Sequence, residues 1–186
     1  MQTDAVKAVT LEGVDAVMTD VPKVCVSVST ADCIPILIYD RVHHAVAAVH
    51  AGWRSTVLRI PEAVLQAMAG AYGTRPQDVE AAIGPGISLE AFEVGNEVYE
   101  AFRTVGFPMG EMARRYPAAG DGSGRMEKWH LDLWQANRGL LEGCGVPSTR
   151  IHLAGVCTYL HSERFFSARR LGIRSGRILN GIFLTD

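Results

Sequence analysis

The chain has 186 residues, which is the size of one ordinary domain. Apolar residues make up 48% of it and charged residues 20%, a composition that excludes a disordered protein. The net charge is −2 and no basic run stands out, so a protein that binds nucleic acid through charge is excluded. The apolar runs are far shorter than the ~20 residues of a membrane helix, and the N-terminus lacks a signal-peptide pattern. We therefore expect a cytoplasmic protein that does not contact membranes.

Three strands are predicted in the first quarter of the chain. Residues 24–29 alternate between apolar and polar side chains, whereas residues 34–39 and 45–50 are short apolar runs. The segments follow one another closely, with a turn after the second, so the sequence predicts an antiparallel meander.

Helices and further strands follow in chain order. Helical spacing of apolar residues over 55–72 predicts one helix that Pro61 kinks, or two helices of which Pro61 begins the second. Glycine and proline mark a surface loop over 116–125. Two more helices are predicted over 96–105, with Asn96 as N-cap, and over 130–143, and further strands over 79–83, 151–156 and 178–184.

These elements mix strands and helices without strict alternation, which predicts an α+β fold. We expect a central β-sandwich or mixed sheet covered by helices.

The first candidate site combines Cys33 with His50. Cys33 lies at the start of one predicted strand and His50 at the end of the next, so a hairpin would bring them together. A thiolate and an imidazole are good zinc ligands, and an imidazole can also deprotonate a thiol to give a nucleophile. A buried structural pair is the other interpretation. Asp32 and Arg54 place charges at the same strand ends, which favours a functional site.

Two further segments carry candidate binding residues. Backbone N–H groups around Gly84 could hold an anion or the edge of a base, unless the loop is only structural. Phe166 and Arg170 belong to a segment of aromatic and basic residues that could stack a flat ring and clamp an oxyanion. The alternative there is a solvated basic turn after core aromatics. His161 could be a further metal ligand.

Five motifs of the chain resemble, in order, those of the YfiH-type laccase-domain family, also called the polyphenol-oxidase or purine nucleoside phosphorylase family. The resemblance covers nearly the whole chain. The motifs are Thr30-Ala31-Asp32-Cys33, His50-Ala51-Gly52-Trp53-Arg54, Ile83-Gly84-Pro85, Phe92-Glu93-Val94-Gly95, and Cys157-Thr158 leading to Phe165-Phe166-Ser167 and Arg169-Arg170.

The resemblance implies an α+β fold with a central β-sandwich and a zinc site of two histidines and one cysteine that acts on purine nucleosides. Cys33 matches the cysteine ligand and His50 the second histidine. The first histidine belongs to a Gln-x-His motif, where this chain has Gln2-Thr3-Asp4. We therefore expect residues 1–186 to form a single laccase-type domain that lacks the N-terminal segment of the family.

The family is linked to phosphorolysis of adenosine, inosine and methylthioadenosine and to deamination of adenosine. We therefore expect a zinc enzyme of this type, with copper less favoured, whose partners are a purine nucleoside and phosphate. The predicted catalytic residues are Cys33, His50, Arg54 and Asp32, of which Cys33 and His50 hold the metal. Arg54 is the first candidate for phosphate, and the other predicted substrate-binding residues are Arg170, Gly84 and Phe166.

Three alternatives remain open. The chain could be a metal-free Cys–His hydrolase or a factor that edits peptidoglycan precursors, to which bacterial members of the family are linked. It could be a laccase-like copper polyphenol oxidase, as older descriptions of the family have it. It could also be a non-catalytic module that has lost a metal ligand.

Overall fold

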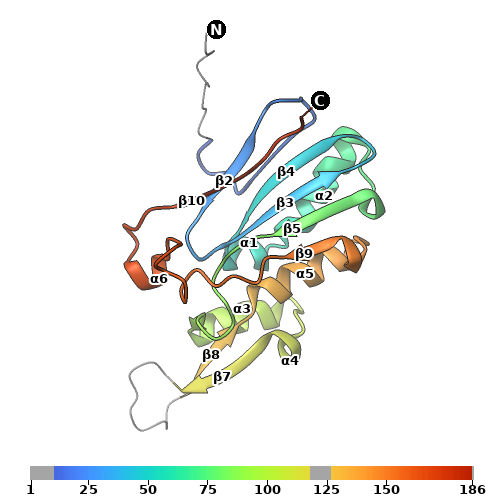
Figure 1. The fold of residues 1–186 in the computed structure, drawn as a ribbon. Helices are drawn as coiled ribbons and strands as arrows, with labels where there is room; N and C mark the ends of the chain where they lie inside the picture. The colour runs from blue at the N-terminus through green and yellow to red at the C-terminus, as the bar shows by residue number, and fades with distance from the viewer. Residues whose placement is uncertain (1–10, 118–126, 186) are drawn as a thin grey trace, which may run out of the picture.

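The centre of the molecule is a five-stranded mixed sheet with the strand order β1-β4-β3-β5-β9 (Figure 1). The structure is a computed structural model that describes residues 11–117 and 127–185. Neighbouring strands of this sheet are antiparallel except β5 and β9, which run parallel. The strands are β1 (Ala16–Thr19), β3 (Ile34–Asp40), β4 (Ala45–Ala51), β5 (Val79–Ile83) and β9 (Ile151–Leu153).

The central strands β3 and β4 are almost entirely apolar because both of their faces are covered. On one face, Ile36 and Ile38 are fully buried and pack in one core with Met68 of α2 (Ile60–Tyr72) and Leu141 of α5 (Leu133–Gly143). Strands alternate their side chains between faces, so the opposite face carries Leu37 and His50. The predicted α+β class and the hairpin of β3 with β4 are confirmed.

The predicted three-stranded meander is wrong, because β2 (Val26–Thr30) does not pair with β3. It pairs antiparallel with β10 (Ile178–Ile182) in a separate two-stranded sheet that contacts β3 and β4. The two edges of β3 are already occupied by β4 and β5, which leaves no edge for β2. The segment between β2 and β3 therefore carries the chain from one sheet to the other.

A third sheet was not predicted from the sequence. Its strand order is β6-β8-β7, formed by β6 (Glu93–Val94), β8 (Glu127–Leu131) and β7 (Ala113–Pro117). His130 lies in β8, so the helix predicted over 130–143 begins later than expected. The side chain of Asp132 accepts a hydrogen bond from the amide of Gln135 and caps α5, which fixes this start. The predicted loop begins inside β7, and its remaining residues, 118–125, lie outside the described ones.

The remaining helices agree with the predictions in part. The segment over 55–72 contains two helices, α1 (Trp53–Val57) and α2, and the left-handed residue Arg59 with the following Pro61 separates them. The helix α3 (Asn96–Thr104) has Gly95 as its N-cap, so Asn96 lies inside the helix. Strands β9 and β10 are shorter than expected. Two further helices are short, namely α4 (Met109–Met112) and α6 (Ala168–Leu171).

Candidate active site

The β3–β4 hairpin brings Cys33 and His50 together, as predicted from their spacing. Pro35 pairs with His50 in the register of the two strands, so Cys33 lies just beyond the strand end that His50 occupies. Both side chains converge over Gly52. A Cβ at Gly52 would lie 3.2 Å from Sγ of Cys33 and 3.8 Å from Nε2 of His50. The close approach explains why this position carries no side chain.

A carboxylate that the sequence analysis did not find completes this arrangement. Nδ1 of His50 lies 2.8 Å from Oδ1 of Asp15, and the buried hydroxyl of Ser55 donates a hydrogen bond to Oδ2. Asp15 precedes β1 and is 35 residues away from His50 in sequence. Only the pairing of β1 with β4 reveals the contact, and neither the strand β1 nor this pairing was predicted.

The electrostatics of this chain favour a charged imidazole in the metal-free protein. The hydrogen bond with Cys33 contributes most to raising the pKa of His50 to about 9; partial burial opposes this, and Asp15 adds to the increase. For Asp15, burial acts to raise the pKa, but hydrogen bonds from Ser55 and His50 outweigh it and lower the pKa. The imidazolium therefore lies between Cys33 and a carboxylate that is ionised at neutral pH.

Asp32 connects three segments of the chain instead of facing an open space. Its carboxylate accepts hydrogen bonds from Oγ1 of Thr158 and from the amide of Arg169, each at 2.7 Å. Its carbonyl oxygen accepts from the amide of Ile87 at 2.9 Å. The residue is buried and has a left-handed backbone with φ of 81°. Protein donors engage both carboxylate oxygens, so the contacts of Asp32 hold the loop that precedes Cys33 in place.

The glycine-rich loop after β5 does not offer the anion-binding amides that were expected. The amide of Gly84 donates to the carbonyl of Pro35 at 2.9 Å, and the amide of Gly86 donates to the carbonyl of Val156 at 3.2 Å. The carbonyl of Gly84 accepts a hydrogen bond from the indole of Trp134. The neighbouring backbone already uses the polar groups of Gly84, and its role in substrate binding stays a prediction.

The two arginines predicted to bind phosphate are exposed. Arg54 lies in α1, two residues after Gly52, and its guanidinium lies 4.2 Å from the ring centroid of Trp53. Arg170 lies in α6, with its guanidinium 5.1 Å from the ring centroid of Tyr159. Both stacked guanidinium groups keep edges from which N–H groups can reach an anion.

Phe166 and His161 lie in the segment that follows β9. Phe166 is 46% exposed, and its ring lies against Gly176, where a Cβ would come within 2.5 Å of Cζ. His161 is exposed, with Nδ1 3.5 Å from a carboxylate oxygen of Glu163. The structure gives His161 no contact with Cys33 or His50.

The metal prediction can be tested against the donors that are present. Cys33 and His50 supply sulfur and nitrogen, which suit zinc and copper. Within residues 11–117 and 127–185, no group of three His, Cys, Asp or Glu side chains is placed to hold a metal ion. The described residues thus fit a metal in the chemistry of their donors, and Cys33 and His50 could supply two of its ligands.

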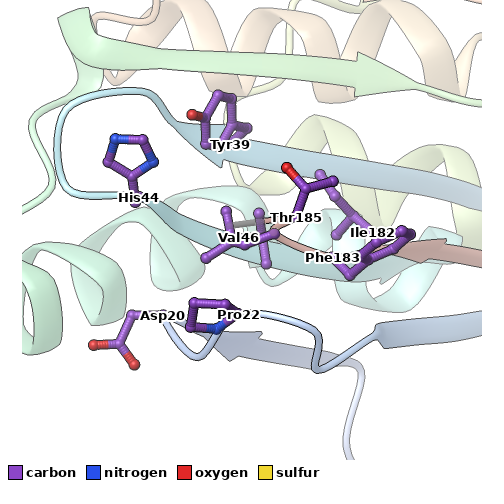
Figure 2. A pocket seen from close by; sticks show the side chains of 9 residues that line it. Asp20, Pro22, Tyr39, His44, Val46, Ile182, Phe183 and Thr185 are labelled. Atoms are coloured by element: carbon purple, nitrogen blue, oxygen red, sulfur yellow. The ribbon is translucent and has the colours of Figure 1, made fainter.

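A separate pocket of about 550 Å³ lies near the other end of the β3–β4 hairpin, where Tyr39, His44 and Val46 line it together with the C-terminal residues 182–185 (Figure 2). Cys33 and His50 do not line this pocket. Its lining is mainly apolar, so we do not assign the chemistry to it.

Comparison with known proteins identifies the family. A family model described as "Multi-copper polyphenol oxidoreductase laccase" matches residues 1–185. The chain belongs to this family. It is 52% identical over 174 residues to a purine nucleoside phosphorylase of Bacteroides thetaiotaomicron, and the match covers 94% of this chain and 62% of that protein. It is 44% identical over 173 residues to adenosine deaminase RL5 from an unknown prokaryotic organism, covering 93% of this chain and 63% of that protein.

A solved structure supports the same family. The crystal structure of Bacillus licheniformis hypothetical protein YfiH superposes with a TM-score of 0.82 at 30% identity, over 92% of this chain and 61% of that one. The chain thus spans somewhat less than two thirds of the length of these family members. In the part of the chain that the structure describes, no helix is long and apolar enough to cross a membrane.

Proposed function

We propose that this chain carries a nucleoside-processing site centred on Cys33 and His50, whose main reaction is the phosphorolysis of purine nucleosides such as adenosine, inosine and methylthioadenosine. The observation that supports the proposal most is the convergence of these two side chains over Gly52 at the end of the β3–β4 hairpin. Relatives named purine nucleoside phosphorylase and adenosine deaminase are consistent with a purine nucleoside as substrate.

We propose zinc as the metal, bound by Sγ of Cys33 and Nε2 of His50 together with ligands outside the described residues. A bound zinc ion supplies positive charge that polarises a substrate atom. The laccase-type family also suggests copper. We prefer zinc because neither phosphorolysis nor deamination of a nucleoside transfers electrons.

In phosphorolysis, an oxygen of phosphate forms a bond to C1′ of the ribose while the bond from C1′ to the base nitrogen breaks. The electron pair of the broken bond leaves with the base, which takes up a proton. The residues of this chain have to hold the phosphate and exclude unproductive orientations. Arg54 is our first candidate to neutralise phosphate, since its guanidinium lies on the helix that begins directly after Gly52. Arg170 and the exposed ring of Phe166 are candidates for further substrate contacts.

The products from adenosine separate the two expected activities. Purified protein is incubated with adenosine, with and without inorganic phosphate, and the products are resolved by chromatography. Phosphorolysis gives adenine and ribose 1-phosphate only when phosphate is present, whereas deamination gives inosine and ammonia without it. If neither set of products forms in zinc-supplemented protein, the proposal is wrong.

One observation favours a second candidate function. His50 forms hydrogen bonds with both Cys33 and Asp15. A thiol, an imidazole and a carboxylate linked in this way resemble the arrangement that activates the nucleophile of cysteine hydrolases. The thiolate would attack an acyl carbon, for instance in a peptidoglycan precursor, and the imidazolium would protonate the departing amine. Water would then cleave the resulting thioester, which releases the acid and restores the thiol. Hydrolysis that survives metal chelation and stops after alkylation of Cys33 would support this candidate. Loss of nucleoside cleavage on chelation would contradict it.

A further inference from the structure

Asp15 holds His50 at two points. The backbone amide of His50 donates to the carbonyl oxygen of Asp15 at 2.7 Å, and Nδ1 lies 2.8 Å from the carboxylate oxygen Oδ1. The strand β1 begins at the next residue, and Ala16 pairs with Val49 in β4. The sheet therefore fixes the backbone of Asp15 relative to that of His50, so the side-chain contact does not depend on a mobile loop.

The contact determines which nitrogen of His50 faces the site. A carboxylate only accepts hydrogen bonds, so it holds the imidazole proton on Nδ1. When the ring is neutral, as a metal ligand must be, Nε2 carries the lone pair, and Nε2 lies on the side of the ring that faces Gly52 and Sγ of Cys33. From this geometry we propose that Asp15 is a positioning residue that fixes the tautomer and the ring orientation of His50. The inference rests on the proposed function in one respect, namely that Nε2 of His50 serves the reaction.

Ser55 strengthens this arrangement from the helix α1. Its hydroxyl is buried and donates to Oδ2 of Asp15, while Nδ1 of His50 engages Oδ1. The side chain of Asp15 is itself 45% exposed and would otherwise be free to turn toward water. Because both oxygens are hydrogen-bonded, the carboxylate keeps one orientation. Ser55 therefore helps Asp15 to hold the ring of His50 in place.

The chain contains a matched pair elsewhere. Nε2 of His152 in β9 lies 2.8 Å from Oε1 of Glu80 in β5, and both side chains are exposed. The distance is the same as in the Asp15–His50 pair, and an imidazole again contacts a carboxylate, here through Nε2 instead of Nδ1; neither Cys33 nor His50 is involved. Glu80→Gln therefore controls for the loss of one carboxylate–imidazole contact on the sheet.

The test uses Asp15→Asn, which preserves the size of the side chain and its ability to hydrogen bond. An amide can accept from one imidazole nitrogen or donate to it, so it no longer imposes one tautomer. In the Cys33→Ala background, where the thiol cannot influence the ring, nitrogen NMR spectra of neutral His50 report which nitrogen carries the proton. We expect the proton on Nδ1 with Asp15 and with Asp15→Glu, and a loss of this preference with Asp15→Asn.

A second readout is the affinity of the otherwise unchanged chain for Zn²⁺ alone, measured by competition with a chromophoric chelator. Loss of a carboxylate that orients a ligating histidine typically lowers metal affinity by about 10–100-fold. We expect a decrease of this size for Asp15→Asn, a smaller one for Ser55→Ala and none for Glu80→Gln. An unchanged tautomer or an unchanged Zn²⁺ affinity in Asp15→Asn would overturn the inference.

The outcomes also separate this inference from the proposed function. If Asp15→Asn changes both readouts while the unmodified chain cleaves no nucleoside, the positioning role stands and the proposed reaction is wrong. If the unmodified chain cleaves nucleosides and Asp15→Asn leaves both readouts unchanged, the reaction stands and the positioning role is wrong.

Discussion

Replacement of Asp32 by alanine tests whether this residue holds the loops around Cys33 together. The substitution removes the acceptors of two hydrogen bonds, one from the fully buried hydroxyl of Thr158 and one from the amide of Arg169. A hydrogen bond to a charged group contributes about 1.5–3 kcal/mol, and a buried donor left without a partner is destabilising. The hydrogen bond from the amide of Arg169 is only partly buried, so the two contributions do not add in full.

We therefore expect Asp32→Ala to lower the free energy of unfolding by about 3 kcal/mol. In a chain of this size, this corresponds to a decrease in Tm of roughly 6–12 °C. Asp32→Asn keeps one acceptor oxygen and a side chain that tolerates the left-handed backbone, so we expect about 1 kcal/mol. Urea unfolding at neutral pH, followed by circular dichroism, measures both values.

A double-mutant cycle with Thr158→Val isolates the contact between the two side chains. We expect a coupling energy of at least 0.5 kcal/mol, because the residues share one hydrogen bond. The reasoning is refuted if Asp32→Ala unfolds within 0.5 kcal/mol of the unmodified chain, or if Asp32→Asn is as unstable as Asp32→Ala.

Three further predictions follow from single features of the structure. Zinc must displace the proton of His50, whose pKa is about 9, and any proton on the sulfur of Cys33. The Zn²⁺ affinity should therefore rise by at least about tenfold per pH unit from pH 6 to 8 in competition titrations, and a flat profile would contradict this. Gly86→Ala should destabilise the protein in thermal unfolding, because a Cβ there would clash with Ile34 and lie 3.1 Å from the carbonyl oxygen of Asp32; an unchanged Tm would count against it. Burial acts to raise the pKa of Asp40, but the nearby Thr74 hydroxyl and hydrogen bonds from the amides of His43 and Val42 outweigh it and lower the pKa. The stabilisation by Asp40 should therefore be present above pH 3.8 and lost as the pH falls through the lowered value, and Asp40→Asn should flatten this part of the acid-unfolding curve.

The hairpin that brings Cys33 and His50 together could be predicted because it depends on local sequence. Two apolar runs separated by a short turn strongly favour antiparallel pairing, and the positions of the two residues at strand ends then follow. Pro61 allowed two alternatives from the sequence, a kinked helix or the start of a second one, and the structure shows the second, with the proline in the first turn of α2.

The features that were missed depend on contacts between distant parts of the chain. The pairing of β2 with β10 joins residues about 150 positions apart, and the alternating pattern of β2 does not specify its partner. His130 was assigned to a helix because the apolar spacing continues into β8, whereas the cap at Asp132 begins the helix. Asp15 belongs to a strand of four residues with no distinctive pattern, so its contact with His50 becomes visible only in the folded structure.

The comparison of Cys33→Ala with Cys25→Ala tests directly whether the reaction takes place at Cys33 and His50. Cys25 is an exposed free cysteine before β2 and serves as the matched control. The measurement is phosphate-dependent release of free base from adenosine and inosine by the zinc-supplemented chain. We expect the unmodified chain and Cys25→Ala to release base at equal rates and Cys33→Ala to release none. Equal release by Cys33→Ala and Cys25→Ala would contradict the placement of the reaction at Cys33 and His50.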